Sequence, residues 1–476
     1  MCIIPDIIMN ILLIFPSQSG KERYGKLARS GTYLPPLGLA YLAAMLENAH
    51  QVRILDGSVM PVTPEALRSE LRRFKPNIVG LSVNTPAIYR ALEICGIVKQ
   101  ASPDSLTVLG GPHPSALPEE VLRHDSVDIV VHGEGEHSFQ ELVSLLDQGQ
   151  DLAACKGIGF KKHGAMLINA PRERITELDA LPLPARHLLP MDRYRPSVLH
   201  YKRLPAFSVM CSRGCPHRCT FCACSKVFRR KVTWRSPENV IEEIRHLKDR
   251  YNAREILIWD DNFGMSREWA VKFCALMKPL GLTWSAWMRV DSADPDLLKR
   301  MRDSGCWHAS YGVESGNQRV LDSIKKGFTL DQVRAAFRIT HDAGMEARGT
   351  FIFGLPNDTW ETMMETIELA IELKADYAQF QLMTPYPGTE FWDTAAQYGK
   401  FDTGDLSKYT IWFPVFIPNG LTKEDLVKAH RLAYRKFYFR PGYIMDRIAS
   451  VRSWEDVKRN VRGVLSLGEY LSDRGN

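Results

Sequence analysis

The sequence predicts an α/β protein with two successive strand–helix regions and a smaller helical region at its C-terminal end. Short apolar runs alternate with segments of helical spacing twice along the chain, and a proline-rich segment separates the two series. At 476 residues the chain is too long for one hydrophobic core. We expect a first domain over residues 1–160, a linker over 161–200, a second domain over 201–400 and a mostly helical region over 401–476.

The first region has the pattern of a doubly wound, Rossmann-like parallel sheet. Segments with helical spacing, such as LGLAYLAAMLENA and PEALRSELRRF, lie between short apolar runs. The expected strands are Ile11–Pro16, Val52–Asp56, Ile78–Val83, Thr107–Gly111 and Asp128–Glu136. Several of them run directly into Gly, Ser, Asn or Pro. Small and polar residues at the carboxyl ends of such strands are where this architecture binds ligands.

The second region repeats strand and helix six times, which predicts a partial (β/α)6 barrel. Its expected strands contain AFSVMC, EILIWDDN, LTWSAWMRVD, ASYGVESG, ARGTFIFGLP and YAQFQLMTPYPG. Functional groups of such barrels lie at the carboxyl ends of the strands. The proline-rich connector, Leu178–Pro196, disfavours regular structure. The third region is aromatic and basic, and we expect its helices either to pack on the barrel or to cover the site.

Composition favours a cytoplasmic globular protein. The formal charge of +6 is small for this length and gives weak support for nucleic-acid binding. The apolar stretch near the start is interrupted by Asp6 and Asn10 and lacks a preceding basic segment. It reads as a leader before a buried strand, with Met9 as an alternative start. The sequence has no run of about eighteen uncharged apolar residues, so we expect no membrane span.

Five of the ten cysteines fall between Cys211 and Cys224. Cys215, Cys219 and Cys222 form C-x3-C-x2-C directly after the first strand of the second region. Three thiolates at this spacing can each hold one iron of a [4Fe–4S] cluster and leave the fourth iron open. The alternative is a structural zinc ion, with Cys211 or Cys224 as fourth ligand. Zinc sites usually pair two knuckles, and no second knuckle follows here.

The stretch SRGCPHRCTFC resembles the signature of the radical S-adenosylmethionine (SAM) superfamily. The resemblance implies that the three cysteines hold the cluster, that SAM chelates the open iron, and that a flavodoxin- or ferredoxin-type donor supplies the electron. Arg213, His217 and Arg218 are expected to offset the negative charge of the cluster. The motifs WDDNF, MRVD and YGVESG follow in the family's order, so the SAM contacts implied are Phe221, Asp260, Arg289, Glu314 and Ser315.

The first region resembles the cobalamin-binding domain that precedes many radical SAM barrels. The similar phrases are YLPPLGLAYLAAMLE, GLSVNT, VLGGPHPSALPEE and VDIVVHGEGEHSFQELV. Glycines let a backbone approach a bulky ligand, and hydroxyls and amides can bind a nucleotide tail. The cobalamin contacts implied are Ser82, Asn84, Thr85, Gly110, Gly111, Gly133, Glu134 and Gly135. The loop PSQSGKERYG has no histidine, so we expect no protein histidine on cobalt and a loop-shaping role for His113.

Both resemblances together imply a cobalamin-dependent radical SAM enzyme. Its expected reaction is transfer of a methyl group from SAM, by way of methylcobalamin, to an unactivated carbon after hydrogen abstraction by a 5'-deoxyadenosyl radical. Some relatives use the same cofactors for rearrangement or ring formation without methyl transfer, and this alternative stays open. A second alternative is a cobalamin-binding sensor or carrier with a structural metal. The small-molecule or peptide substrate does not follow from the residues.

Overall fold

Seven strands form the first sheet, in the spatial order β2-β1-β3-β4-β5-β6-β7. The computed structural model describes residues 8–16, 22 and 31–471, so most of the proposed leader and most of the loop after the first strand lie outside the described residues. The strands are β1 (Asn10–Phe15), β2 (Gln51–Asp56), β3 (Ile78–Ser82), β4 (Leu106–Gly110), β5 (Ile129–Val131), β6 (Ile158–Lys162) and β7 (Ala165–Ile168).

The first five of these strands are parallel, which confirms the doubly wound architecture. Strand β1 lies inside the sheet with Ile11 to Ile14 fully buried, because helices cover both of its faces. Those helices are α2 (Leu37–Leu46), α3 (Pro64–Phe74), α4 (Ile88–Ala101), α5 (Pro112–Ala116), α6 (Pro118–Leu122) and α7 (Gly135–Asp147). Strands β6 and β7 were not predicted. They add an antiparallel hairpin at one edge, so the sheet continues past residue 160.

The second sheet has six parallel strands in the order β15-β14-β13-β12-β11-β8, as predicted for a partial barrel. They are β8 (Ala206–Val209), β11 (Glu255–Ile258), β12 (Thr283–Met288), β13 (Cys306–Glu314), β14 (Glu346–Phe353) and β15 (Tyr377–Leu382). The helices of this domain are α9 (Pro237–Tyr251), α10 (Arg267–Met277), α11 (Pro295–Asp303), α12 (Gln318–Ser323), α13 (Leu330–Asp342) and α14 (Trp360–Glu372). Ser236 caps α9 before Pro237.

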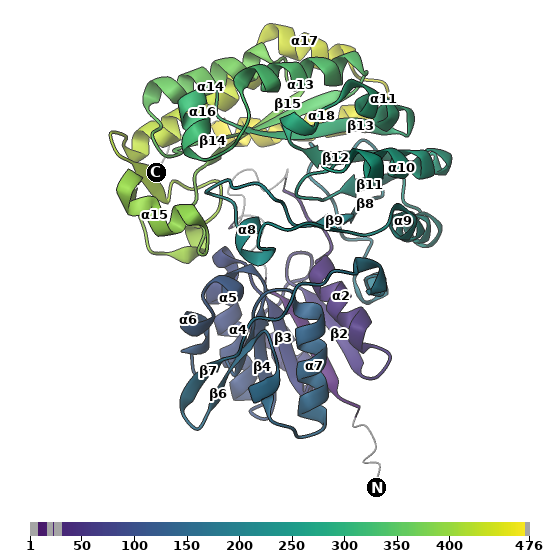
Figure 1. The fold of residues 1–476 in the computed structure, drawn as a ribbon, viewed down its shortest axis with the longest axis vertical. Helices are drawn as coiled ribbons and strands as arrows, with labels where there is room; N and C mark the ends of the chain where they lie inside the picture. The colour runs from purple at the N-terminus through teal and green to yellow at the C-terminus, as the bar shows by residue number, and fades with distance from the viewer. Residues whose placement is uncertain (1–7, 17–21, 23–30, 472–476) are drawn as a thin grey trace.

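The two α/β domains stack one above the other, with the short helix α8 (Cys224–Val227) between them (Figure 1). The connector after β7 contains only short 3-10 turns, as its prolines predicted. It is packed rather than loose, because the Tyr194 hydroxyl donates to Asp56 at 2.7 Å and Arg186 is buried against Glu243.

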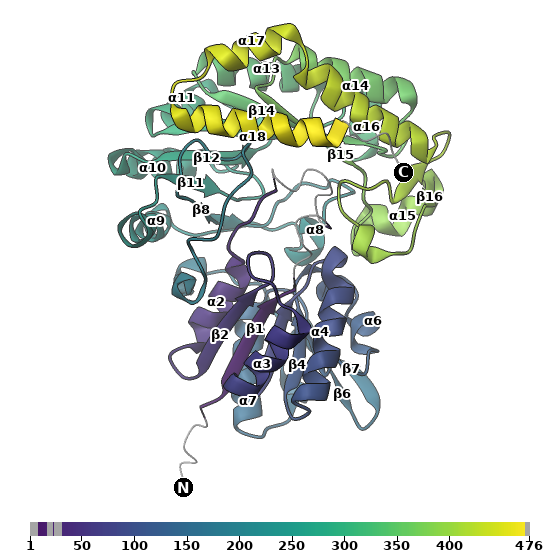
Figure 2. The ribbon, with the colours of Figure 1, turned by 180° about the vertical axis from the view of Figure 1, so that it is seen from behind.

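The C-terminal region packs on the barrel. It contains α15 (Glu390–Tyr398), β16 (Gly399–Phe401), β17 (Phe416–Pro418), α16 (Lys423–Tyr438), α17 (Pro441–Ala449) and α18 (Trp454–Leu471). Helix α18 crosses in front of the second sheet in Figure 2. The predicted packing of the basic, aromatic segment is confirmed, since Phe437 is fully buried while Arg435 and Lys436 are exposed. Within the described ranges, no helix combines the length and apolar character needed to cross a bilayer.

Candidate active site between the two sheets

Loops that follow strands of both sheets line one shared cavity. Its volume is ≈1040 Å³. The first domain lines it with loops that follow β3, β4 and β5, including Asn84, Thr85 and Gly133. The second domain contributes α8 and the residues after it, and the C-terminal region contributes Trp412. The polar ends of two parallel sheets therefore converge on a space large enough for bulky ligands.

The cysteine loop is closed at its base by a two-residue antiparallel ribbon. Strand β9 (Ser212–Arg213) pairs with β10 (Thr233–Trp234), so the residues between them form a closed loop at the carboxyl end of β8. Gly214 has a positive φ of 94°, and a Cβ there would lie 2.0 Å from the Lys231 carbonyl oxygen. Only glycine fits this turn.

Two adjacent carboxylates fasten this loop to the barrel. Asp260 accepts hydrogen bonds from the Cys211 and Ser212 amides at 2.7 and 3.2 Å and from the Ser212 hydroxyl at 2.7 Å. Asp261 accepts from the Gly214 amide at 3.1 Å. Burial raises the pKa of Asp260 to about 6, and the three donors oppose this shift. Both residues follow the end of β11, and the oxygens of Asp260 are already engaged by the loop.

The three cysteines of the motif lie half-buried on this loop. The Cys219 thiol lies 3.8 Å from Nη1 of Arg289, whose guanidinium also pairs with Asp291 at 2.9 Å. Burial raises the pKa of Cys219, and the charges of Lys326 and Arg289 oppose that shift. A hydrogen bond from Cys224 lowers the pKa of Cys222 to about 7. Burial raises the pKa of Cys215 as well, so the nearby cations oppose but do not reverse the effect of burial on Cys215 and Cys219.

No three Cys, His, Asp or Glu side chains in the described part of the chain converge tightly enough to hold a single metal ion. Each iron of a [4Fe–4S] cluster takes a separate thiolate, so the three motif cysteines need not converge on one point. Three half-buried thiols on one fixed loop therefore fit a cluster with one iron free.

A buried lysine lies next to the cysteine loop. Lys326 Nζ donates to Glu314 Oε1 at 2.6 Å and lies 5.7 Å from the centre of the Phe221 ring. Glu314 ends β13 with a positive φ of 73°, an uncommon conformation that the surrounding structure must hold in place. Arg289 Nη2 donates to the Lys326 carbonyl at 2.7 Å, so Phe221, Arg289 and Glu314 lie around this lysine; their contact with SAM stays a prediction. Ser315 is fully buried and contacts Thr366 at 3.4 Å, away from these charges.

All eight residues predicted to contact cobalamin line one of two adjoining cavities. Asn84, Thr85 and Glu134 line the larger one. A narrower cavity of ≈140 Å³ extends into the first domain, and its walls include Ser82, Gly110, Gly111 and Gly135. Gly133 lines both cavities, so they meet at this residue.

Glycines open the narrow cavity. A Cβ on Gly111 would lie 2.8 Å from the Val83 amide nitrogen, and its φ is 98°. Gly38 and Gly80 also line this cavity, although the sequence did not point to them. Bare backbone on several sides fits a flat or elongated group that enters from the larger cavity.

Arg213, two residues before the first motif cysteine, faces the other domain. Arg213 pairs with Glu134 at 2.9 Å and with Glu136 at 2.6 Å, and all three side chains are buried. Burial lowers the pKa of Arg213, but the two carboxylates outweigh it and raise the pKa overall. The expectation that Arg213 offsets the cluster charge is therefore corrected: it joins the domains, and Arg289 stands beside the cysteines.

Two histidines flank the larger cavity. His113 is buried, and its Nδ1 lies 3.2 Å from the Thr85 hydroxyl, so it ties two loops together as predicted. Burial lowers its pKa to about 4, which keeps the ring neutral. His132, which the sequence did not single out, lines the cavity with its Nε2 buried and without a hydrogen-bond partner in the described structure.

Comparison with known proteins agrees with this two-part site. Residues 209–370 match the Radical SAM superfamily, and residues 26–143 match the B12 binding domain. An uncharacterized methyltransferase of Pyrococcus horikoshii is 37% identical over 96% of this chain and 98% of its own length. The chain belongs to the cobalamin-dependent radical SAM enzymes. An anaerobic magnesium-protoporphyrin IX monomethyl ester cyclase of Rubrivivax gelatinosus is 29% identical over 92% of this chain and 78% of its own length.

Solved structures of cobalamin-dependent radical SAM enzymes share the fold. The methyltransferase TsrM from Kitasatospora setae, solved with cobalamin and a [4Fe–4S] cluster, has a TM-score of 0.70 at 15% identity and covers 97% of this chain and 99% of its own. OxsB, solved with aqua-cobalamin and SAM, has a TM-score of 0.72 at 18% identity over 96% of this chain and 72% of its own. At these identities the likeness concerns the fold, including the order of the two domains.

Proposed function

We propose that this cobalamin-dependent radical SAM enzyme transfers a methyl group from SAM to an unactivated carbon. The observation that carries the proposal is the cavity of ≈1040 Å³, which loops after β3, β4 and β5 line from the first domain and the cysteine loop and the loop after β15 line from the second. Methyl transfer by this chemistry needs a radical source and a methyl donor on opposite sides of one substrate. The cysteine loop and the glycine-rich loops of the first domain stand on those two sides.

In this enzyme the barrel binds the cluster and SAM, and the first domain binds cobalamin. Cys215, Cys219 and Cys222 hold the cluster, and Phe221, Arg289, Glu314 and the newly found Lys326 surround SAM. Asp260 and Ser315 are also assigned to the SAM site; Asp260 accepts a hydrogen bond from the Cys211 amide, and Ser315 contacts Thr366. The cobalamin residues are those of the two adjoining cavities: Ser82, Asn84, Thr85, Gly110, Gly111, Gly133, Glu134 and Gly135.

When bound, the cluster and SAM supply a carbon-centred radical and the corrinoid supplies the methyl group. The chain itself fixes and shields these groups. Arg289 and Lys326 place positive charge beside the cysteines, and Asp260 holds the backbone of their loop. Arg213 fixes the distance between the two halves through its pairs with Glu134 and Glu136. Trp412 and its neighbours cover the cavity from the C-terminal region, which limits access of water.

We also propose that the electron comes from a flavodoxin- or ferredoxin-type protein and that the enzyme acts in the cytoplasm. The half-buried cysteine loop supports a route for an external electron, because the thiols are not sealed inside the barrel. Reduction of a cluster by such donors requires a reducing compartment, and the scattered cysteines outside the loop suit that compartment.

The decisive experiment is anaerobic incubation of the reconstituted chain with methyl-deuterated SAM, cobalamin, a reductant and extracts of the native host. A product heavier by one deuterated methyl group supports methyl transfer. The cyclase relatives support the alternative of rearrangement or ring formation, less strongly than the methyltransferase relatives support methyl transfer, and a product with an unchanged carbon count would reject methyl transfer. Failure to cleave SAM, with cobalamin still bound, would instead indicate a cobalamin sensor or carrier.

A further inference from the structure

A second cavity, of ≈500 Å³, lies between the barrel and the three C-terminal helices α16, α17 and α18. Its wall is mainly apolar and aromatic. The side chains that make this wall are Val198, Tyr434, Tyr438, Tyr443, Val457 and Leu467. Helix α18 forms its outer side, across the face of the second sheet in Figure 2. The cavity is not needed to explain the cofactor site.

One charged side chain in this cavity has no counter-ion. Arg348 of β14 is almost fully buried, and no carboxylate of the described residues pairs with it. Its Nη2 donates to the amide oxygen of Gln379, and its guanidinium lies 5.1 Å from the centre of the Trp287 ring. Its Nε and Nη1 have no hydrogen-bond partner in the described structure. A buried, unpaired guanidinium is costly unless a ligand completes it.

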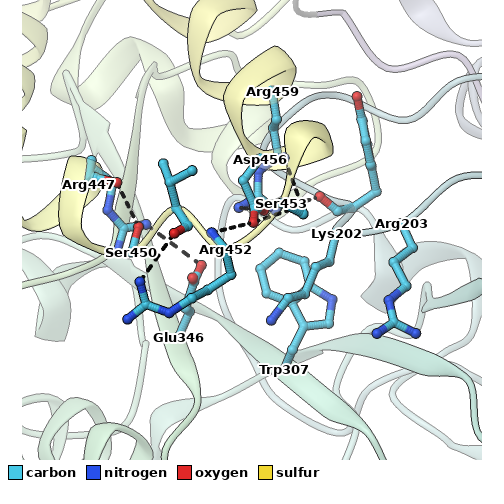
Figure 3. Close-up of polar contacts among 12 residues, drawn as sticks. Lys202, Arg203, Trp307, Glu346, Arg447, Ser450, Arg452, Ser453, Asp456 and Arg459 are labelled. Carbon is cyan, nitrogen blue, oxygen red and sulfur yellow. Dashed lines mark hydrogen bonds and ion pairs between the residues drawn. The ribbon is translucent and has the colours of Figure 1, made fainter.

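The other two arginines of the cavity are already neutralised. Arg447 pairs with Asp376 at 2.8 Å and with Glu346 at 3.8 Å. Arg459 pairs with Asp456 at 3.2 Å and donates to the Tyr201 carbonyl. Figure 3 shows the pairs of Arg447 with Glu346 and of Arg459 with Asp456; the first ties α17 to β14. Arg447 and Arg459 therefore already have counter-ions, and among the arginines that line this cavity in the described residues only Arg348 has none.

The outer end of the cavity is apolar and open to solvent. Ile444 and Ile448 of α17 and Val461 and Val464 of α18 line it, and between 43% and 69% of each side chain is exposed. No Asp or Glu of the described residues lines the cavity. An apolar mouth leading to one buried cation is complementary to a molecule with an anionic head and an apolar body.

The inner end of this cavity adjoins the cofactor site. Trp412 lines both this cavity and the ≈1040 Å³ cavity. Trp287, which lies under the Arg348 guanidinium, precedes Arg289 by two residues on the strand end that contacts Cys219. The end of a ligand held at Arg348 would therefore be the end nearest the cofactors.

We infer that the substrate is an anionic amphiphile, with a carboxylate or phosphate at Arg348 and an apolar body along the part of this cavity that α17 and α18 line, here called the groove. This inference rests on the proposed function, because it treats this cavity as an extension of the same enzyme's substrate space, next to the cavity of ≈1040 Å³ at Trp412. It places the carbon that is methylated in the part of the molecule close to its anionic head. The groove then holds the apolar remainder while its outer end reaches solvent.

The test uses the full chain and four twelve-carbon probes: dodecanoate, dodecyl phosphate, dodecan-1-ol and dodecyltrimethylammonium. Binding is followed by tryptophan fluorescence below the micellar concentration of each probe. We expect saturable binding of one anionic probe per chain, tighter than the alcohol, and no binding of the cation. The relative affinities of dodecanoate and dodecyl phosphate distinguish the two kinds of head group. Arg348→Gln should weaken anionic binding by at least about tenfold and leave the alcohol nearly unchanged.

A second variant tests the groove itself. Val464→Glu places a carboxylate at the solvent-exposed mouth of the cavity and should weaken the binding of the anionic probes. Lys458→Gln lowers the charge of the same helix by the same amount, but outside the cavity, and should leave the binding of these probes unchanged. Equal affinity for acid and alcohol, or an unchanged affinity in Arg348→Gln, would overturn the inference. So would a dimer in solution that Val464→Glu dissociates, because the apolar mouth would then be an interface between copies.

Failure of this inference and failure of the proposed function give different results. Probe binding requires neither iron, SAM nor reductant, and SAM cleavage is measured without a probe. If the protein cleaves SAM but shows no preference for anionic probes, the inferred substrate class is wrong and the proposed enzymatic function stands. Anion binding in a protein that cannot cleave SAM would remove the enzyme and leave the site.

Discussion

Removing Arg213 should weaken the junction between the two domains more than any surface charge change. The Arg213 guanidinium and the side chains of Glu134 and Glu136 are each less than a tenth exposed. Arg213→Met leaves two buried carboxylates close together without a cation. Breaking a buried pair in this way costs about 3–5 kcal/mol. We therefore expect a decrease of about that size in the free energy of opening the domain junction.

The suitable assay is native-state hydrogen exchange of the backbone amides in the cysteine loop, measured at several urea concentrations. It reports local opening, which a single unfolding curve of a multidomain chain does not. Adding Glu136→Gln to Arg213→Met removes one of the stranded charges and should recover about half of the loss. Arg254→Met breaks an exposed pair with Glu455 and serves as the control, with a change below about 1 kcal/mol.

Two results would refute this reasoning. A loss below about 1 kcal/mol in Arg213→Met would mean that the carboxylates are hydrated and that the pairs do not join the domains. A double variant that is weaker than Arg213→Met would mean that Glu136 stabilises the junction by contacts other than its ion pair.

Three further variants test separate parts of the account. Gly38 lines the ≈140 Å³ cavity, and no atom lies within 4 Å of the position that a Cβ on this residue would take. Gly38→Leu should therefore fill the cavity and lower cobalamin affinity at least about tenfold while the chain stays folded. Unchanged cobalamin binding would place the corrinoid tail elsewhere. Gly214→Ala sets a Cβ against the Lys231 carbonyl and should lower the iron content of the purified protein, whereas full iron content would show that the turn can adjust. Asp358 is buried just before α14, and this burial raises the pKa of its carboxyl group from 3.8 to about 7. The stability that its protonation provides is fully present below pH 3.8 and is lost as the pH rises through about 7. Asp358→Asn does not titrate, and its urea midpoint should fall less than that of the wild type between about pH 5 and pH 7.5; parallel curves would contradict the shift.

The sequence predicted the strands well because buried parallel strands are apolar runs with clear ends. The five parallel strands of the first sheet and all six of the second sheet were expected. The hairpin of β6 and β7 was missed because FKKHGAML carries two lysines and a histidine, and every residue of β7 is exposed. An edge hairpin of this kind lacks the apolar pattern by which a buried strand is recognised.

The site was predicted in so far as it depends on local motifs. The C-x3-C-x2-C loop and the glycine turns are short-range features that can be recognised from the spacing and type of neighbouring residues. Lys326 and Arg348 could not be found this way. In sequence each is one more basic residue, and only the barrel brings Lys326 to Glu314 and leaves Arg348 without a carboxylate. For Asp260 the motif was found from sequence, whereas its hydrogen bonds to the loop backbone are visible only in the structure, and its contact with SAM stays a prediction.

The central claim is that one chain holds a cluster with one open iron opposite a cobalamin whose cobalt carries no protein histidine. Electron paramagnetic resonance of the reduced, reconstituted protein, combined with metal analysis, tests both halves. We predict iron and sulfide in equal amounts, a cluster signal that changes when SAM is added, and a cob(II)alamin signal without nitrogen splitting. Zinc in place of iron, a cluster signal that ignores SAM, or splitting that disappears in His132→Ala would contradict the account.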